Sequence, residues 1–227
     1  MHFLLLGASG RTGQLVLSAA LAKNHTLTAL VRNPTTFPTT TTTTSANLTL
    51  IPGSPTSSAD LSTALSTTTT PIDAVIITLA IARKSDSPFS ALASPAFLIR
   101  DTVRALLPQM KAHGVRRLIV MSTFGAGASW KHLAWPMKAV MKWSNMAYVL
   151  EDHDAVEREV RGSEGVEWVL VKPAMLKDGE AKAVREFGEG GEGVGLLDGI
   201  TRESVAKVLV EAAEGEDWDE RIVVIAN

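Results

Sequence analysis

Near the amino terminus the chain reads HFLLLGASGRTGQLVLSAA over residues 2–20. An apolar run ends at Gly7, glycines recur at Gly10 and Gly13, and apolar residues then return at the spacing of one helix face. Glycine suits a tight strand-to-helix turn, and the helix N-terminus behind such a turn offers unpaired N–H groups to a phosphate. The stretch therefore predicts a strand–turn–helix unit that holds the pyrophosphate of a dinucleotide.

Apolar runs alternate with helix-length amphipathic stretches through the rest of the chain. Strands are predicted at residues 2–6, 26–31, 48–51, 74–79, 117–122, 167–171 and 221–225, and helices at 11–23, 59–66, 95–113, 135–161 and 202–214. Because the strands are almost wholly apolar, we expect both faces of the sheet to be covered. The pattern predicts one α/β domain over residues 1–227, Rossmann-type, with a doubly wound, mostly parallel sheet and a small C-terminal substrate-side region.

Composition narrows the function classes. The 227 residues carry 22 Lys and Arg against 24 Asp and Glu, so no strong positive field is available to hold nucleic acid. The lack of cysteine excludes disulfides and thiolate chemistry, and the five histidines are not spaced as metal ligands, so no metal site is predicted. The apolar runs are too short for a signal sequence or a membrane span, which indicates a cytoplasmic protein without a membrane partner.

The end of the second predicted strand, Val31-Arg32-Asn33-Pro34, bears on the choice of cofactor. In dinucleotide-binding folds an acid at this place bonds the ribose 2′-hydroxyl of NAD, whereas an arginine suits the 2′-phosphate of NADP. Arg32, with Arg11 in the glycine turn as a second cation, therefore favours NADPH. The alternative is that Arg32 is a solvated loop residue.

Few polar side chains are expected near a bound nicotinamide. Ser122 ends the fifth predicted strand, where it either orients the carboxamide or a substrate carbonyl or only caps a turn. Asp152 and His153 lie on a helix that we expect to begin after Tyr148, where the acid could hold the histidine as a proton donor. The alternative for this pair is an exposed helix start.

Three kinds of segment interrupt the pattern. Residues 128–150 carry three tryptophans, three lysines and no acid, and predict either a lid that stacks a flat aromatic substrate or a core-packing helix with a basic outer face. The glycine-rich residues 188–199 predict a flexible loop on the substrate side, or simply a linker. The runs Thr39–Thr44 and Thr67–Thr70 indicate surface loops, because threonine runs bury little apolar area.

The glycine spacing and the run from Leu30 to Pro34 resemble the NmrA-like, or atypical short-chain dehydrogenase/reductase, group of NAD(P)-binding proteins. Residues 118–123, 168–173 and 200–206 are similar to that group's fifth strand, sixth strand and late helix start. Within the group, Asp152-His153 and residues 172–179 are similar to biliverdin-IXβ/flavin reductase and to oxidoreductases of fungal aromatic-polyketide pathways. The expected cofactor contacts are Gly7, Ser9, Gly10, Arg11, Thr12, Gly13, Arg32, Ser122 and Pro173, and the expected catalytic residues are Ser122, Asp152 and His153.

The chain departs from the related enzymes in two places. Classical short-chain dehydrogenases pair a tyrosine acid with a lysine four residues later, which lowers the pKa of the phenol. Here the only tyrosine is Tyr148, and the residue four positions later is Asp152. The negative charge of an aspartate would raise the pKa of the phenol rather than lower it. The flavin-reductase relatives carry a histidine where this chain has Met175. The standard alcohol-dehydrogenase mechanism and a proton relay through residue 175 are therefore unsupported.

These features predict an NADPH-dependent oxidoreductase, monomer or homodimer, that delivers hydride to a flat conjugated acceptor: a flavin, quinone, tetrapyrrole or aromatic polyketide of secondary metabolism. Catalysis is expected to come mainly from proximity, with water or a weak side-chain acid supplying the proton. Two alternatives stay open. One is a non-redox tailoring enzyme on the same fold, an isomerase or ring-opening enzyme. The other is an NmrA-like regulatory protein that senses dinucleotide and binds a protein partner.

Overall fold

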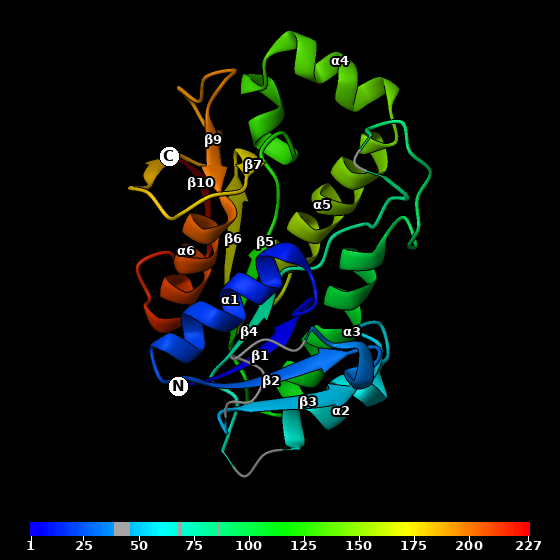
Figure 1. Cartoon of the computed structure of the whole chain (residues 1–227), viewed down its shortest axis with the longest axis vertical. Helices are drawn as coiled ribbons and strands as arrows, with labels where there is room; N and C mark the ends of the chain where they lie inside the picture. Colours follow the sequence, from blue (N-terminus) through cyan, green and yellow to red (C-terminus); the bar gives the residue numbers. More distant parts are fainter. Residues whose placement is uncertain (39–45, 68–69, 86) are drawn as a thin grey trace.

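The computed structural model describes residues 1–38, 46–67, 70–85 and 87–227 (Figure 1). The central sheet of these residues consists of β1 (His2–Leu6), β2 (Thr26–Val31), β3 (Leu48–Pro52), β4 (Ala74–Ile77), β5 (Arg117–Met121), β6 (Glu167–Pro173), β8 (Arg185–Phe187) and β10 (Arg221–Ala226). Their spatial order is β3-β2-β1-β4-β5-β6-β10-β8. Neighbouring strands are parallel except β10 and β8, which pair antiparallel.

Helices cover both faces of this sheet. They are α1 (Arg11–Ala22) and α6 (Arg202–Glu214) on one face, and α2 (Ser58–Ser66), α3 (Leu98–Ala112) and α5 (Met146–Arg161) on the other. In β1, Phe3 and Leu5 join the first core, and Leu4 and Leu6 join the second. Because successive strand residues point to opposite faces, a strand covered on both sides must be apolar throughout. The predicted Rossmann-type α/β class, doubly wound and mostly parallel, is confirmed.

The winding direction of the chain changes between β1 and β4. From β1 the chain passes through α1 to β2 and on to β3, and it then crosses back to β4, β5 and β6 on the other side of β1. In open parallel sheets, ligands bind at such a switch point, outside the carboxyl ends of the strands. The turns that follow β1, β4 and β5 therefore form the edge where a ligand is expected.

The predicted single helix over residues 135–161 is wrong. The structure has two helices, α4 (Trp135–Trp143) and α5, because Ser144 leaves the helical conformation with φ −126° and ψ 176°. The interpretation of residues 128–150 as a core-packing helix is also wrong, since α4 contains no buried residue. α4 lies beyond the carboxyl ends of the strands, at the top of Figure 1.

Smaller differences concern strand ends and short elements. β4 ends at Ile77 rather than residue 79, β6 extends to Pro173, and the 3-10 turns η1 (Pro34–Thr36) and η3 (Gly127–His132) were not predicted. β8 and the separate pair β7 (Met175–Lys177) and β9 (Gly199–Thr201) have three residues each, too few to show a period. The run Thr39–Thr44 and residues 68–69 of the second threonine run lie outside the described residues.

Candidate cofactor and active site

The β1–α1 turn is built so that two of its glycines have no room for a side chain. Gly7 has a φ of +97°, and a Cβ there would lie 2.8 Å from the backbone of Thr78, which follows β4. A Cβ on Gly13 would lie 2.1 Å from the carbonyl oxygen of Gly7. At Gly10 the corresponding distance is 3.3 Å. Gly7 and Gly13 therefore allow α1 to start directly against the ends of β1 and β4.

The N-terminus of α1 fits a bound anion. Its N-cap residue, Gly10, makes no side-chain cap hydrogen bond, and the first turn contains no acid. The first turns of such helices carry backbone N–H groups without intrahelical partners and a partial positive charge. Ser9 and Arg11 are exposed beside this N-terminus, and Thr12 is buried within it. The predicted phosphate-binding residues thus lie together, and their chemistry fits the pyrophosphate of a dinucleotide.

Arg32 directly follows β2, the neighbour of β1 in the sheet. Its side chain is exposed, and it forms no hydrogen bond or ion pair within the described ranges of the chain. β1 and β2 pair in parallel, so Arg32 and the glycine turn lie at the same edge of the sheet. This is the position from which a cation reaches the 2′-substituent of an adenosine ribose.

Ser122 and His153, which the sequence suggested separately, lie in contact. Ser122 follows β5 and His153 lies in α5; the Ser122 Oγ is 3.3 Å from the His153 Nδ1, and both residues are buried. Burial, together with the nearby Lys172 ammonium, lowers the pKa of His153 to about 4. The imidazole is therefore neutral at pH 7.

The side chain of His153 is almost wholly enclosed. The residue is 5% exposed, and the contact with Ser122 is the one side-chain hydrogen bond that it makes within the described part of the chain. Nδ1 therefore faces the serine hydroxyl.

Asp152 does not hold His153, although the two are adjacent in sequence. Its carboxylate accepts hydrogen bonds from the backbone N–H groups of Ile99, at 3.0 Å, and Arg100, at 2.8 Å, in the first turn of α3. Asp152 is wholly buried, and burial raises its pKa while the two N–H groups act in the opposite direction. The pair is thus not the exposed helix start considered above, and Asp152 caps a neighbouring helix.

A buried ion pair that the sequence analysis missed lies beside His153. Lys172 of β6 has no exposed surface, and its Nζ donates to the Glu157 Oε2 and to the Ala126 carbonyl oxygen, both at 2.8 Å. Glu157 stands four residues after His153, so both lie on one face of α5. This spacing is the feature of the sequence that could have indicated that Glu157 lies close to His153. The pair fixes the segment that leads from Ser122 to α4.

The glycine-rich residues 188–199 pack on that same segment. A Cβ at Gly191 would lie 2.4 Å from the ring of Phe124, and one at Gly190 would lie 3.3 Å from the ring of His132. Glu189 pairs with Arg161 of α5. The loop therefore lies on the side of the molecule formed by residues 124–132. Pro173, another expected cofactor contact, is buried at the end of β6, and its carbonyl accepts from the Phe124 N–H at 3.1 Å.

Two findings bear on metals and membranes. Within the described ranges, no group of three or more His, Asp or Glu side chains is arranged to hold a metal ion. No helix in the same ranges combines the length and apolar character needed to cross a bilayer.

Comparisons with known proteins identify the family. A profile described as NAD(P)H-binding matches residues 7–216. No curated protein matches the sequence. Solved structures of similar fold include ChuY, an anaerobilin reductase from Escherichia coli O157:H7, at 18% identity and TM-score 0.75, covering 99% of this chain and 96% of that one.

Two further structures agree in fold. A putative NAD-dependent epimerase/dehydratase from Bacillus halodurans has 22% identity and TM-score 0.77, with 100% of this chain and 94% of that chain covered. A short-chain dehydrogenase/reductase from Veillonella parvula, in complex with NADP, has 16% identity and TM-score 0.76, again with 100% and 94% covered. With the profile covering nearly the whole length and the glycine turn in place, the chain belongs to the NAD(P)H-binding family.

Proposed function

We propose that the protein is an NADPH-dependent oxidoreductase that transfers hydride to a flat conjugated acceptor, such as a flavin, quinone, tetrapyrrole or aromatic polyketide. The observation that carries this proposal is the contact between the Ser122 hydroxyl and a neutral, buried His153 at the ligand-binding edge of the sheet. A fold with a dinucleotide turn and a proton-handling pair at one edge has the parts that a reductase needs.

The choice of NADPH rests on Arg32. An exposed guanidinium after β2 matches the site where a 2′-phosphate is recognised, and no acid takes that place. Arginine presents planar paired donors to a phosphate, which adds both energy and orientation. The NADP complex of a protein with a similar fold is compatible with this choice.

Bound NADPH would supply the hydride, and the residues of this chain would stabilise the charge that develops on the acceptor. In this proposal the Ser122 Oγ–H donates to the acceptor atom that gains charge, and the Nδ1–H of neutral His153 donates to the Ser122 Oγ, which makes the hydroxyl a better donor. Solvent supplies the proton that the reduced acceptor takes up. No charged intermediate of His153 is required, which suits a group whose pKa is about 4.

The same arrangement restricts the acceptor. Asp152 caps α3, and no lysine stands four residues after Tyr148, so a tyrosine–lysine acid is not assembled. A hydroxyl backed by a neutral imidazole is a weak acid. Acceptors that delocalise the incoming charge over a conjugated ring system need little acid help, and they are therefore favoured over simple ketones.

The test is NADPH oxidation with a panel of free flavin, menadione, biliverdin and a hydroxylated anthraquinone. We expect turnover of at least one of them, and a loss of about 100-fold in kcat/KM for Ser122→Ala, within the usual range for general acid catalysis. Thr123→Val is the matched control, since the Thr123 hydroxyl makes only a 3.4 Å contact to the Phe124 carbonyl oxygen. No NADPH consumption with any acceptor, or a product formed without NADPH consumption, contradicts the proposal.

A further inference from the structure

The helix α4 leaves an apolar face uncovered. Trp135 and Trp143, at its two ends, are 80% and 77% exposed, and none of its nine residues is buried. Pro136, Ala139, Val140 and Trp143 follow the i, i+3, i+4, i+7 spacing that places residues on one side of a helix. In a globular protein such a stripe ordinarily packs on the core. In α4, three of these four residues are exposed, and the fourth is half-buried.

The helix contacts the rest of the protein through a different side. Met137 and Met141 are half-buried and stand four residues apart, so they share one side of α4. At 3.6 residues per turn, that side is roughly opposite the apolar stripe. The stripe is therefore not the surface by which α4 packs on the fold, and it is left for a partner.

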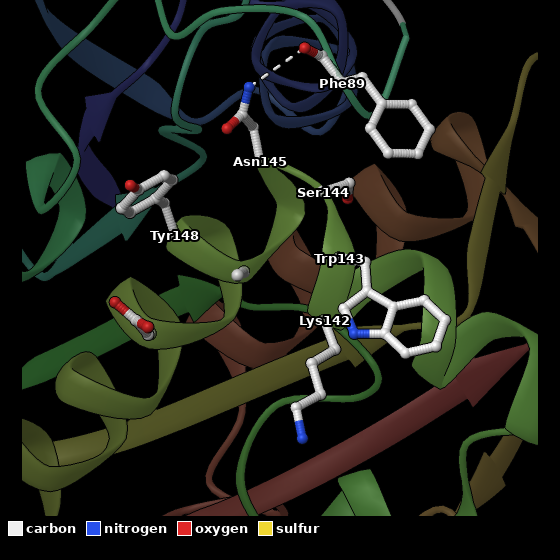
Figure 2. A pocket seen from close by; sticks show the side chains of 8 residues that line it. Phe89, Lys142, Trp143, Ser144, Asn145 and Tyr148 are labelled. Atoms are coloured by element: carbon white, nitrogen blue, oxygen red, sulfur yellow. Dashed lines mark hydrogen bonds between the residues drawn. The ribbon is translucent and has the colours of Figure 1, made fainter.

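A second segment extends this apolar surface. Phe89, which follows β4, is 66% exposed and lines a pocket of about 520 Å³ together with Trp143. Figure 2 shows both rings on the same side of that pocket, with the Lys142 side chain below them. Asn145 fixes the backbone at this place, because its Nδ2 donates to the carbonyl oxygens of Phe89, at 3.2 Å, and Ser90, at 3.0 Å. Phe89 thus lies beside the end of the stripe on α4.

Lysines without acidic partners border the apolar surface. Lys138 and Lys142 stand four residues apart along one edge of the stripe, and Lys131 precedes the helix. Within the described ranges none of the three forms an ion pair, and the Lys138 Nζ donates to the Lys131 carbonyl oxygen at 2.9 Å instead. Glu151 is the one acid that lines the pocket. The surface is therefore locally positive, on a chain whose formal net charge is −2.

We infer that α4, together with Phe89, forms a docking surface for an anionic lipid bilayer. The helix lies in the plane of the membrane interface, the rings of Trp135, Trp143 and Phe89 enter the boundary between headgroups and acyl chains, and the lysines contact lipid phosphates. This inference goes beyond the proposed function and does not depend on it. The expectation of no membrane partner rests on the lack of a spanning or signal segment, and a helix that lies on the surface needs neither.

Charge and composition favour a bilayer over a second copy of the chain. Two copies that met through α4 would bring lysines of like charge together, and like charges across an interface oppose association. Tryptophan is enriched at membrane interfaces, because its ring is apolar while its N–H remains hydrated. In Figure 1, α4 lies beyond the carboxyl ends of the strands, so a bilayer bound there is on the side of the molecule where a ligand is expected.

The test is sedimentation of the whole protein with sucrose-loaded vesicles, of phosphatidylcholine alone and of equimolar phosphatidylcholine and phosphatidylglycerol. We expect binding to the anionic vesicles that weakens as salt is added, and little binding to the neutral ones. Trp135→Ala and Trp143→Ala should each weaken binding about tenfold, because each removes a large apolar group from the interface. Trp218→Ala is the control, since Trp218 precedes β10 at the opposite edge of the sheet, and it should leave binding unchanged.

The charge requirement has its own variants. Lys138→Gln and Lys142→Gln should each weaken binding to the anionic vesicles about fivefold. Lys111→Gln should not, because Lys111 is exposed in the last turn of α3, near the amino end of β5. No binding to anionic vesicles at low salt, or binding that the α4 variants leave unchanged, overturns the inference. A dimer in sedimentation velocity that Trp143→Ala dissociates also overturns it, since a second copy then covers the surface.

Discussion

At the scale of single residues, the three glycines of the β1–α1 turn have different roles. The space at Gly13 is filled by a backbone oxygen, which no rotamer change can move, whereas the space at Gly10 is only slightly tight. Gly7 needs its positive φ as well as its missing side chain. Gly7 and Gly13 are therefore required by the packing of the turn itself. Gly10, at the N-cap, is less constrained by packing, and its role is better explained by close approach of a ligand.

The predicted consequence is a difference in stability between two alanine variants. Gly13→Ala forces α1 away from β1 and should lower the free energy of unfolding by about 2–3 kcal/mol, the cost of overpacking a tight contact. Gly10→Ala should lower it by less than about 1 kcal/mol, since φ is −75° there and a shift of tenths of an ångström relieves the contact. Urea denaturation measures both. A Gly13→Ala protein as stable as the Gly10→Ala protein contradicts this assignment.

At the scale of elements, α3 begins without a cap of its own. Its N-cap residue Phe97 makes no side-chain cap hydrogen bond, and the carboxylate of Asp152, in α5, accepts from the N–H groups of Ile99 and Arg100 in the first turn. This contact joins two helices on the same face of the sheet. It also fixes the start of α3, where the segment that follows β4 ends. Asp152 is therefore a residue that stabilises the packing of α3 against α5.

Asp152→Ala should accordingly destabilise the protein without touching the cofactor. Two buried N–H groups lose their acceptor, which costs about 1–3 kcal/mol of unfolding free energy. Asp101→Ala is the control, because Asp101 lies in the same first turn with a 45% exposed side chain and should cost less than about 1 kcal/mol. Thermal unfolding compares the two. Similar melting temperatures for both variants contradict the capping role.

At the scale of the whole molecule, His153 makes stability depend on pH. Its pKa is about 4 in the folded protein and 6.5 in its ordinary state, so the unfolded chain binds the proton first as pH falls. The stabilisation is complete above pH 6.5 and is lost progressively as pH falls toward 4. This difference in pKa corresponds to about 3 kcal/mol of unfolding free energy.

His153→Gln should remove this part of the pH dependence. At pH 7 the unfolding free energies of the variant and the unaltered protein differ by a fixed amount, because the variant loses packing and the contact with Ser122. The difference between them should shrink or reverse as pH falls from 6.5 to 4, by up to about 3 kcal/mol. Urea denaturation at a series of pH values measures it. Parallel stability curves for the two proteins show that His153 is not kept neutral by the fold.

The features that the sequence predicts are those fixed by residues close together in the chain, and the features that it misses depend on residues far apart in the chain. β1, β2 and α6 have the predicted bounds, because local apolar runs, glycine and capping residues specify them. Asn145, next to the helix break at Ser144, donates to the carbonyl groups of residues 88–90, which are 55 or more positions away. The role of Asp152 depends on α3, 52 or 53 positions away. Ser122 and His153 were each recognisable, but their contact spans 31 positions and requires the folded sheet.

Calorimetric titration with NADPH and with NADH tests the proposed NADPH dependence. The unaltered protein should bind NADPH at least about tenfold more tightly than NADH, because one or two charge-assisted hydrogen bonds to the 2′-phosphate contribute that much free energy. Arg32→Glu should abolish this preference. Arg116→Glu is the control, since Arg116 immediately precedes β5, at the opposite edge of the sheet. A preference for NADPH that Arg32→Glu removes and Arg116→Glu retains is the predicted result. Equal affinities for the two nucleotides, or a ratio unchanged by Arg32→Glu, contradict it.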